Sequence, residues 1–140
     1  MNGVKMADYS IPFIDLTVPA GFPSRAADYA EARINLGSAL IRNPGTTYVM
    51  RCEGDSMINV FIPPKCLLVV DRGVEATNGD IVVAVINGEW TVKRLEKNQY
   101  RCKLLAENSK YADIEITPGM NFQVWGVVIH IISTPKRRKQ

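Results

Sequence analysis

The sequence predicts a mostly β domain with an extended N-terminal arm and one short helix. From Thr46 onward, short runs of β-branched and other apolar residues alternate with turn residues, which is typical of antiparallel strands. Before that point, Pro12, Pro19 and Pro23 interrupt the chain, and proline neither continues a helix nor donates a hydrogen bond to a sheet. A length of 140 residues fits one domain of ordinary size.

The N-terminal elements are expected to be short. We expect Ser24 to cap an alanine-rich turn that extends to Ala32, and Asn35 to cap a helix over residues 36–41 that ends before Pro44. Together with the strands that follow, these elements divide the chain into three parts: an arm over residues 1–23, a β domain over 24–135 and a basic tail over 136–140.

The β domain has one especially clear local signal. Asn87-Gly88 separates two apolar runs, and this pair supplies the two positive φ angles that a type I′ hairpin turn requires. We therefore predict a hairpin at this position. In chain order, the predicted strands are residues 46–52, 67–71, 80–86, 89–95, 100–105 and 122–132.

Composition and charge exclude several classes of protein. Hydrophobic residues make up 46% and charged residues 22%, so the chain can bury a core. The net charge is +3, but the last five residues include four of the positive charges, which leaves a nearly neutral body. Because binding to nucleic acid needs clustered Lys and Arg on the folded surface, we expect direct DNA binding to be weak or absent. The four residues are Lys136, Arg137, Arg138 and Lys139.

Neither a disulfide framework, nor a metal site, nor a membrane span is indicated. Cys52, Cys66 and Cys102 form no C-x-x-C pair, and the carboxylates lack the spacing of a metal-binding loop. No apolar run reaches the ~20 residues of a membrane helix, and the N-terminus lacks the features of a signal peptide. We expect a cytoplasmic protein with free thiols and no cofactor.

Two side chains are candidates for catalysis. Ser56 follows a predicted strand within Gly-Asp-Ser-Met, and Lys93 lies among apolar residues in the second strand of the hairpin. Loss of solvation would lower the pKa of this lysine from about 10.4, and a neutral lysine beside a serine can activate the hydroxyl. On residue types alone, an ordinary solvated lysine remains an alternative, and a triad with His130 stays open, although a histidine in an apolar strand is more typical of a structural role.

Six short segments, in this order and at these spacings, carry a family resemblance. They are Ala20-Gly21-Phe22-Pro23-Ser24, Ala26-Ala27-Asp28-Tyr29, Gly54-Asp55-Ser56-Met57, Gly79-Asp80-Ile81-Val82, Trp90-Thr91-Val92-Lys93-Arg94-Leu95 and Trp125-Gly126-Val127-Val128-Ile129-His130. With these segments the chain resembles the UmuD-like self-cleaving SOS mutagenesis proteins of the LexA/UmuD serine peptidase family. The resemblance runs from about Ile11 to Ile132 and implies the LexA-like peptidase β-fold.

The resemblance assigns roles to residues. It implies that Ser56 is the nucleophile, Lys93 the general base and Ala20-Gly21 the bond that is cut. We expect the backbone N–H groups of Asp55 and Ser56 to form the oxyanion hole, because a turn at the nucleophile presents consecutive donors. The chain departs from the family pattern over residues 59–66, where an acidic turn is replaced by apolar residues and Lys65.

The resemblance also implies partners. It predicts a homodimer that cleaves its arm when stimulated by a RecA filament on single-stranded DNA. The trimmed form would then act in translesion synthesis as an accessory subunit of an error-prone Y-family DNA polymerase, with a UmuC-like polymerase subunit as its partner. Two alternatives remain: a non-catalytic module of the same fold that regulates RecA or a polymerase, and a signal-peptidase-like Ser-Lys enzyme, which the lack of a visible membrane anchor disfavours.

Overall fold

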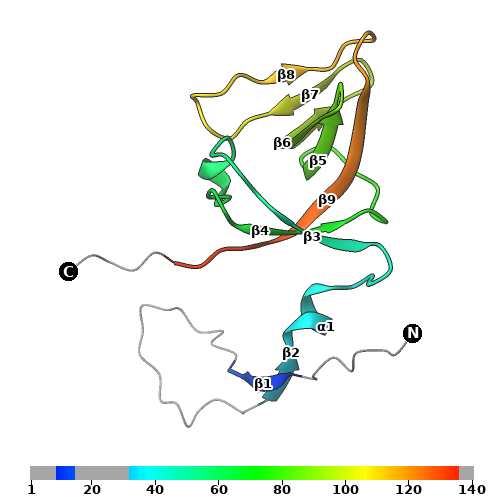
Figure 1. The fold of residues 1–140 in the computed structure, drawn as a ribbon. Coiled ribbons are helices and arrows are strands. Elements are labelled where there is room, and N and C mark those ends of the chain that lie inside the picture. Colours follow the sequence, from blue (N-terminus) through cyan, green and yellow to red (C-terminus); the bar gives the residue numbers. More distant parts are fainter. Residues whose placement is uncertain (1–8, 15–31, 136–140) are drawn as a thin grey trace, which may run out of the picture. The chain divides into compact units, whose positions relative to one another are not determined.

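A computed structural model describes residues 9–14 and 32–135 and divides the chain into two compact units, Met1–Arg42 and Asn43–Gln140 (Figure 1). The predicted boundary after residue 23 and the basic tail lie outside the described residues, as does most of the predicted alanine-rich turn. Each unit is therefore described by itself.

The described part of the first unit is a two-stranded antiparallel sheet followed by a helix. Strand β1 (Ser10–Phe13) pairs with β2 (Ala32–Asn35), and α1 (Leu36–Leu40) follows directly. The assignment of Ala32 to a turn is wrong, because its pairing with Phe13 is a contact between distant segments that local alanine content does not reveal. The predicted cap is confirmed: the Asn35 side chain accepts from the Ser38 N–H at 3.1 Å.

The second unit is a seven-stranded antiparallel sheet, which confirms the mostly β fold class (Figure 1). Its strand order is β3-β4-β9-β5-β6-β7-β8. The two-residue β8 was not predicted, because so short a strand has no recognisable alternation. The strands are β3 (Thr47–Arg51), β4 (Leu67–Asp71), β5 (Ile81–Ile86), β6 (Glu89–Lys97), β7 (Cys102–Leu105), β8 (Ile114–Glu115) and β9 (Phe122–Ile132), and a 3-10 turn, η2 (Ile58–Val60), lies between β3 and β4.

The predicted hairpin joins β5 to β6. Asn87 and Gly88 have φ angles of 49° and 84°, as a type I′ turn requires, and Ile86 pairs with Glu89 at its base. The local signal in the sequence therefore fixes the register of the strand that carries Lys93.

Strand β9 lies between β4 and β5 in the sheet. One part of it pairs with β4 and the other with β5, and the register shifts in both pairings. Such irregularities bend a strand and increase its twist, and β9 is strongly curved in Figure 1. At Gly126 a Cβ atom would lie 2.6 Å from the Val70 side chain, so a residue with a side chain does not fit there without displacing its neighbour.

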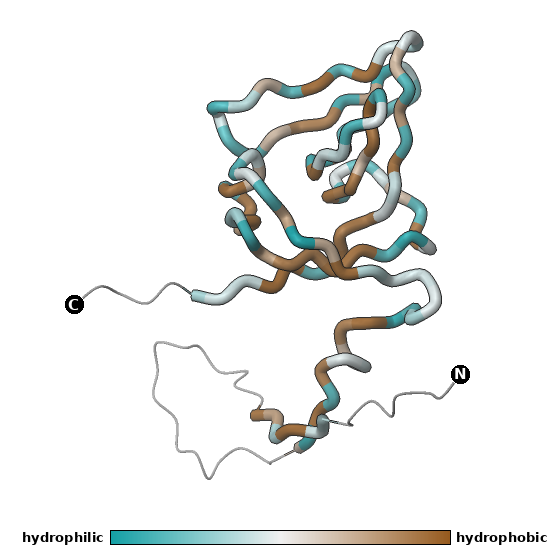
Figure 2. Tube along the Cα trace, in the orientation of Figure 1, coloured by the Kyte–Doolittle hydropathy of each residue, from teal (hydrophilic) through white to brown (hydrophobic). Residues whose placement is uncertain are grey.

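Two clusters of buried side chains form the core, and β5 contributes to both. Val83 belongs to the first cluster, whereas Val82 and Ala84 belong to the second, because successive strand residues point to opposite faces. Both faces of β5 are therefore buried, which explains why its sequence is an uninterrupted apolar run. In Figure 2 the hydrophobic stretches lie mostly along the strands and the hydrophilic ones mostly along the turns. The other buried members are Cys52, Met57, Ile62, Cys66, Leu68 and Val70 in the first cluster, and Leu95, Leu104 and Val127 in the second.

A buried carboxylate fixes the start of the second unit to the end of β4. Asp71 is 1% exposed and accepts hydrogen bonds from the Thr46 hydroxyl at 2.6 Å, the Asn43 amide at 2.9 Å and the Gly73 N–H at 2.8 Å. These three donors favour the ionised carboxylate and lower the pKa of Asp71, the Thr46 hydroxyl most of all.

We predict that Asp71→Asn lowers Tm by several degrees at pH 7. The folded-state pKa of Asp71 lies below its unfolded value of about 3.9, so its contribution is complete above that pH and disappears as pH falls through the folded-state value. The difference in Tm between the two proteins, followed by circular dichroism from about pH 7 to 2, should therefore shrink in acid. A constant difference would contradict this assignment.

Candidate active site

Ser56 lies in a tight turn between β3 and η2. At the start of the turn, the backbone N–H of Cys52 donates to the carbonyl oxygen of Cys66, the residue before β4, at 2.9 Å. Gly54 has a φ angle of 82°, a conformation that favours glycine, and the Ile58 N–H closes the turn on the Asp55 carbonyl at 3.2 Å. The Gly-Asp-Ser-Met segment is therefore a turn that presents the serine directly after a strand.

Lys93 lies on β6 opposite Val82 of β5. As the alternation predicts, it shares a strand face with Thr91 and Leu95, whereas Val92 packs into the first core cluster on the other face. The Lys93 side chain is 8% exposed. A solvated lysine, the alternative left open by the sequence, is therefore wrong.

The Lys93 amine and the Ser56 hydroxyl are in hydrogen-bond contact. Nζ lies 2.9 Å from Ser56 Oγ, 2.8 Å from Thr91 Oγ1 and 3.1 Å from the Val92 carbonyl oxygen. Three oxygens match the three N–H donors of an ammonium group. Either hydroxyl, that of Ser56 or that of Thr91, can donate to the lone pair of the neutral amine, whereas the Val92 carbonyl can only accept.

Burial lowers the pKa of Lys93 from its ordinary value. The partners of Nζ are uncharged oxygens, and the described ion pairs, Arg94–Glu107 and Arg101–Glu115, do not include this lysine. The nearby thiol of Cys52 is itself buried, and this burial raises its pKa to about 11. Cys52 therefore carries no negative charge near neutral pH that would restore the lysine's positive charge.

A cavity of about 370 Å³ opens beside the two side chains. The part of β6 that borders it, Trp90 to Lys93, pairs with β5 on one side, and the register with β7 begins only at Arg94. Among the described residues, no strand pairs with the other backbone edge of Trp90 to Lys93. The lining residues are Met50, Arg51, Cys52, Glu53, Gly54, Asp55, Ser56, Met57, Leu68, Val83, Trp90, Thr91, Val92, Lys93 and Tyr111.

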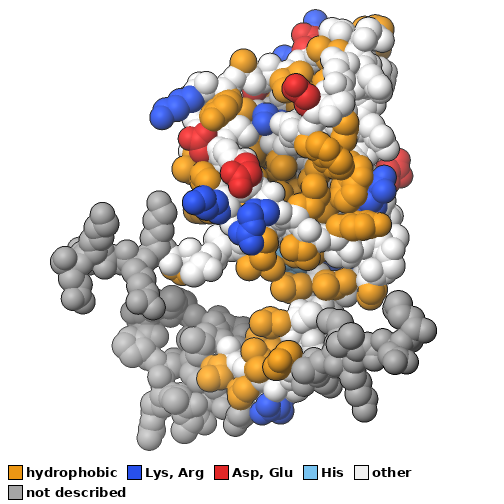
Figure 3. Space-filling view, viewed as in Figure 1, with side chains coloured by type: hydrophobic (Ala, Val, Ile, Leu, Met, Phe, Trp, Pro, Cys, Tyr) orange, Lys and Arg blue, Asp and Glu red, His pale blue; other side chains and the backbone are white. Residues whose placement is uncertain are grey.

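Aromatic side chains extend the apolar surface from this cavity. Trp90 is 55% exposed, and its ring meets Trp125 edge to face with centroids 5.4 Å apart. Tyr48 contacts the same Trp125 ring at 5.2 Å. Figure 3 shows hydrophobic side chains gathered on the face in view, with charged side chains of both signs beside them.

The sequence analysis did not identify three residues that contact the site. Thr91 binds the lysine amine, and strand alternation already placed it on the correct face. Asn108 donates to the Asp55 carbonyl at 2.9 Å, and the Tyr111 hydroxyl donates to the Asp55 carboxylate, which raises the pKa of the tyrosine. No local pattern marks these last two residues, because they approach the turn from a distant loop.

Several sequence predictions concern residues outside the cavity. The predicted cleavage site, Ala20 and Gly21, lies outside the described residues. Residues 59–66, where the chain departs from the family pattern, include Val60 and Phe61. Val60 packs against the first core cluster, and Phe61 is 85% exposed. Neither residue lines the cavity. His130 lies on β9 opposite Val69 and is likewise not a lining residue.

Disulfides, metal-ligand clusters and membrane-spanning helices are not found among the described residues. The three cysteines are free thiols. Within residues 9–14 and 32–135, no three His, Cys, Asp or Glu side chains cluster as metal ligands would. In the same ranges, no helix has the length and apolar character needed to cross a membrane.

Known proteins resemble this chain over most of its length. Residues 12–129 match the Peptidase S24-like family. Protein MucA of Salmonella typhimurium is 41% identical over 123 residues, which cover 87% of this chain and 84% of that protein. Protein SamA of Salmonella typhimurium strain LT2 is 40% identical over 121 residues, with 86% and 84% covered, and protein ImpA of Salmonella typhimurium is 40% identical over 119 residues, with 81% and 77% covered.

These matches confirm the family that the sequence motifs predict. The family is one of serine peptidases, and its match includes both the Ser56 turn and the strand that carries Lys93. The mostly β sheet agrees with the LexA-like peptidase fold. The chain therefore belongs to the Peptidase S24-like family and is a UmuD-like member of its LexA/UmuD group.

Proposed function

We propose that this protein cuts its own chain between Ala20 and Gly21, with Ser56 as nucleophile and Lys93 as general base. The observation that carries the proposal is the hydrogen bond of 2.9 Å between Lys93 Nζ and Ser56 Oγ, made by a lysine that is 8% exposed. A buried amine without a carboxylate partner favours its neutral form, which is the form that accepts a proton.

The reaction proceeds through an acyl-enzyme. Neutral Lys93 takes the Ser56 proton while the oxygen attacks the Ala20 carbonyl carbon, and the resulting ammonium then protonates the departing Gly21 amine. An ester between Ser56 and Ala20 remains. Water gives a proton to Lys93 as it attacks this ester, and hydrolysis releases residues 1–20 and regenerates the hydroxyl.

The backbone N–H groups of Asp55 and Ser56 would stabilise the negative oxygen that develops on the Ala20 carbonyl. Among the hydrogen bonds of the described residues, neither N–H has an acceptor, which supports this role. The Asp55 carbonyl and side chain are both held by the loop over residues 108–111, so the turn is fixed before a substrate arrives.

At the cellular level, we propose a cytoplasmic homodimer that acts in SOS mutagenesis. A RecA filament on single-stranded DNA would stimulate self-cleavage by favouring the pose in which the arm reaches Ser56. The trimmed form would serve translesion synthesis as an accessory subunit of an error-prone Y-family polymerase, bound to its UmuC-like subunit. This assignment rests on similarity to UmuD-like proteins over most of the chain.

A second candidate function is a binding module that regulates RecA or a polymerase without cleavage. The observation in its favour is the altered segment after Ser56, where Phe61 is 85% exposed and offers an apolar contact outside the cavity. Incubation distinguishes the two functions, because a binding module would remain full length.

We predict that Ser56→Ala and Lys93→Met each slow self-cleavage at least about a thousandfold, because the two groups act as a unit. Gel electrophoresis after incubation with RecA, ATP and single-stranded DNA measures the product, and mass spectrometry should find its N-terminus at Gly21. Ser133→Ala and Lys97→Ala are matched controls on exposed positions outside the cavity and should cleave normally. Unchanged yield from either dyad variant would exclude the dyad.

We predict that cleavage in the absence of RecA accelerates with pH and then levels off. The protonated amine of Lys93 is inactive, so the rate should rise about tenfold per pH unit below the lysine's lowered pKa and reach a plateau above it. Rates measured from about pH 6 to 11 test this. The other titratable groups at the cavity are Arg51, Cys52, Glu53, Asp55 and Tyr111.

A histidine base would give a different profile. Its rate would level off near neutrality, at the ordinary pKa of about 6.5. His130→Gln is the matching control and should leave the alkaline rise unchanged. A rate that is flat above neutral pH would argue against Lys93 as the base.

A further inference from the structure

Glu107 is bonded through its backbone to the turn that carries Ser56. Its N–H donates to the Ser56 carbonyl oxygen at 2.8 Å, and its carbonyl oxygen accepts from the Asn59 N–H at 3.0 Å. Two opposed backbone hydrogen bonds fix both the distance and the register of the two segments. A movement of residue 107 is therefore transmitted to the nucleophile turn.

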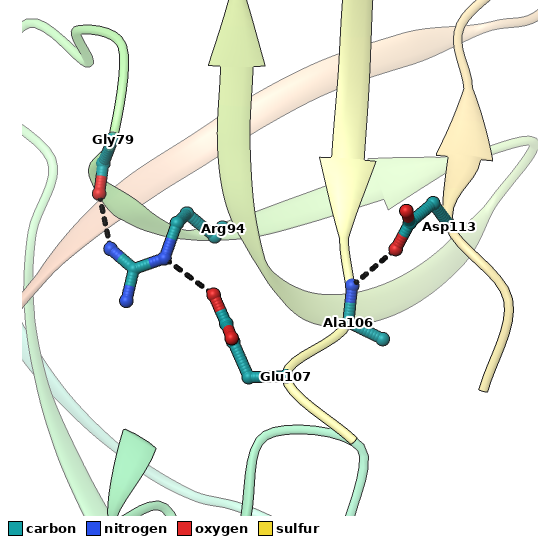
Figure 4. A network of polar contacts seen from close by, with 5 residues as sticks. All are labelled: Gly79, Arg94, Ala106, Glu107 and Asp113. Carbon is teal, nitrogen blue, oxygen red and sulfur yellow. Dashed lines mark hydrogen bonds and ion pairs between the residues drawn. The ribbon is translucent and has the colours of Figure 1, made fainter. Parts of the chain in front are cut away.

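The side chain of the same residue is bonded to β6, the strand that carries Lys93. Glu107 Oε1 pairs with Arg94 Nε at 2.7 Å, and Arg94 Nη1 donates to the Gly79 carbonyl at 2.6 Å (Figure 4). The guanidinium is thus held at two points. Arg94 directly follows Lys93, and the side chains of the ion pair are only 32% and 30% exposed, which protects the pair from full screening by water.

The chain just before Glu107 is anchored as well. The Ala106 N–H donates to Asp113 Oδ1 at 3.1 Å (Figure 4). Apart from the bond between Lys93 and Ser56 themselves, the polar contacts that join the nucleophile turn to β6 in the described residues run through this loop. Glu107 is the residue in it that contacts both sides.

We propose that the hydrogen bond from Arg94 to the Glu107 side chain positions the dyad by setting the separation of Lys93 Nζ and Ser56 Oγ. The proposal rests on the proposed function, since it concerns the same two groups. Arg94 and Glu107 are positioning residues, because neither is in contact with the reacting atoms. Proton transfer needs a heavy-atom separation within hydrogen-bond reach, and a misplacement of about 1 Å can slow catalysis by a factor of about a hundred.

The primary test compares two substitutions of one residue. Glu107→Ala removes the carboxylate and should slow cleavage about ten- to a hundredfold at the alkaline plateau. Glu107→Gln keeps an oxygen that can accept from Arg94, so its rate should stay within about threefold of the wild-type rate. Both rates are measured well below Tm, where a loss of stability alone leaves nearly all molecules folded. A Gln variant as slow as the Ala variant would overturn the proposal.

The chain offers a matched control pair. Arg101 and Glu115 form an ion pair of the same residue types at 4.0 Å, with side chains 69% and 54% exposed. Glu115→Ala should change the cleavage rate by less than about twofold, because an exposed ion pair contributes little. An equal loss of rate in both alanine variants would indicate a general effect of charge and would overturn the proposal.

A second readout does not need the arm. A fluorophosphonate reagent forms a bond from Ser56 Oγ to phosphorus as fluoride leaves and the hydroxyl proton passes to Lys93. Mass spectrometry follows this reaction, which should be slower in Glu107→Ala by a factor similar to that of cleavage. Arg94→Ala should be slow as well, and Arg94→Ala combined with Glu107→Ala should be no slower than either single variant.

The outcomes separate this proposal from the proposed function. If the wild-type protein cleaves itself and Glu107→Ala matches it in both assays, positioning by Glu107 is overturned and self-cleavage stands. If the wild-type protein is labelled but stays full length, self-cleavage is overturned, and the labelling rates of the variants still decide the positioning role. A wild-type protein that neither cleaves nor is labelled overturns both.

Discussion

The desolvation of one amine is the constraint on which the site depends. Lys93 is itself buried on β6 and has three neutral oxygens as partners, so folding favours its uncharged form. A carboxylate next to Nζ would reverse this preference. Two carboxylates near the site are instead engaged with other donors: Glu107 binds Arg94, and Asp55 accepts from Tyr111.

Local chemistry predicted much of the fold. The Asn87-Gly88 turn and the Asn35 cap are decided by residues within a few positions of each other, and both were correct. Runs of mostly apolar residues also gave the bounds of β4 and β9 without error. The pairing of β1 with β2 was missed, because it joins segments whose own composition favours turns and irregular chain.

The residues of the candidate site also fall into those that local sequence can predict and those that it cannot. Ser56 and Lys93 lie 37 positions apart, and no spacing rule brings them together, so family motifs had to supply the connection. The sequence could have predicted Thr91 as a neighbour of Lys93, since residues two positions apart on a strand share one face. Glu107 was not, because its importance comes from a backbone contact with one segment and a side-chain contact with another. From the sequence alone, such a residue cannot be distinguished from an ordinary exposed glutamate.

The position of β9 in the sheet has a consequence for the growing chain. β9 lies between β4 and β5, which do not pair with each other, so it joins the sheet fragment next to Ser56 to the fragment that contains Lys93. Among the described strands, β9 is also the last to be synthesised, and domains form as their segments emerge from the ribosome. A nascent chain in which residues 122–132 have not yet folded therefore lacks the strand that joins these two fragments of the sheet.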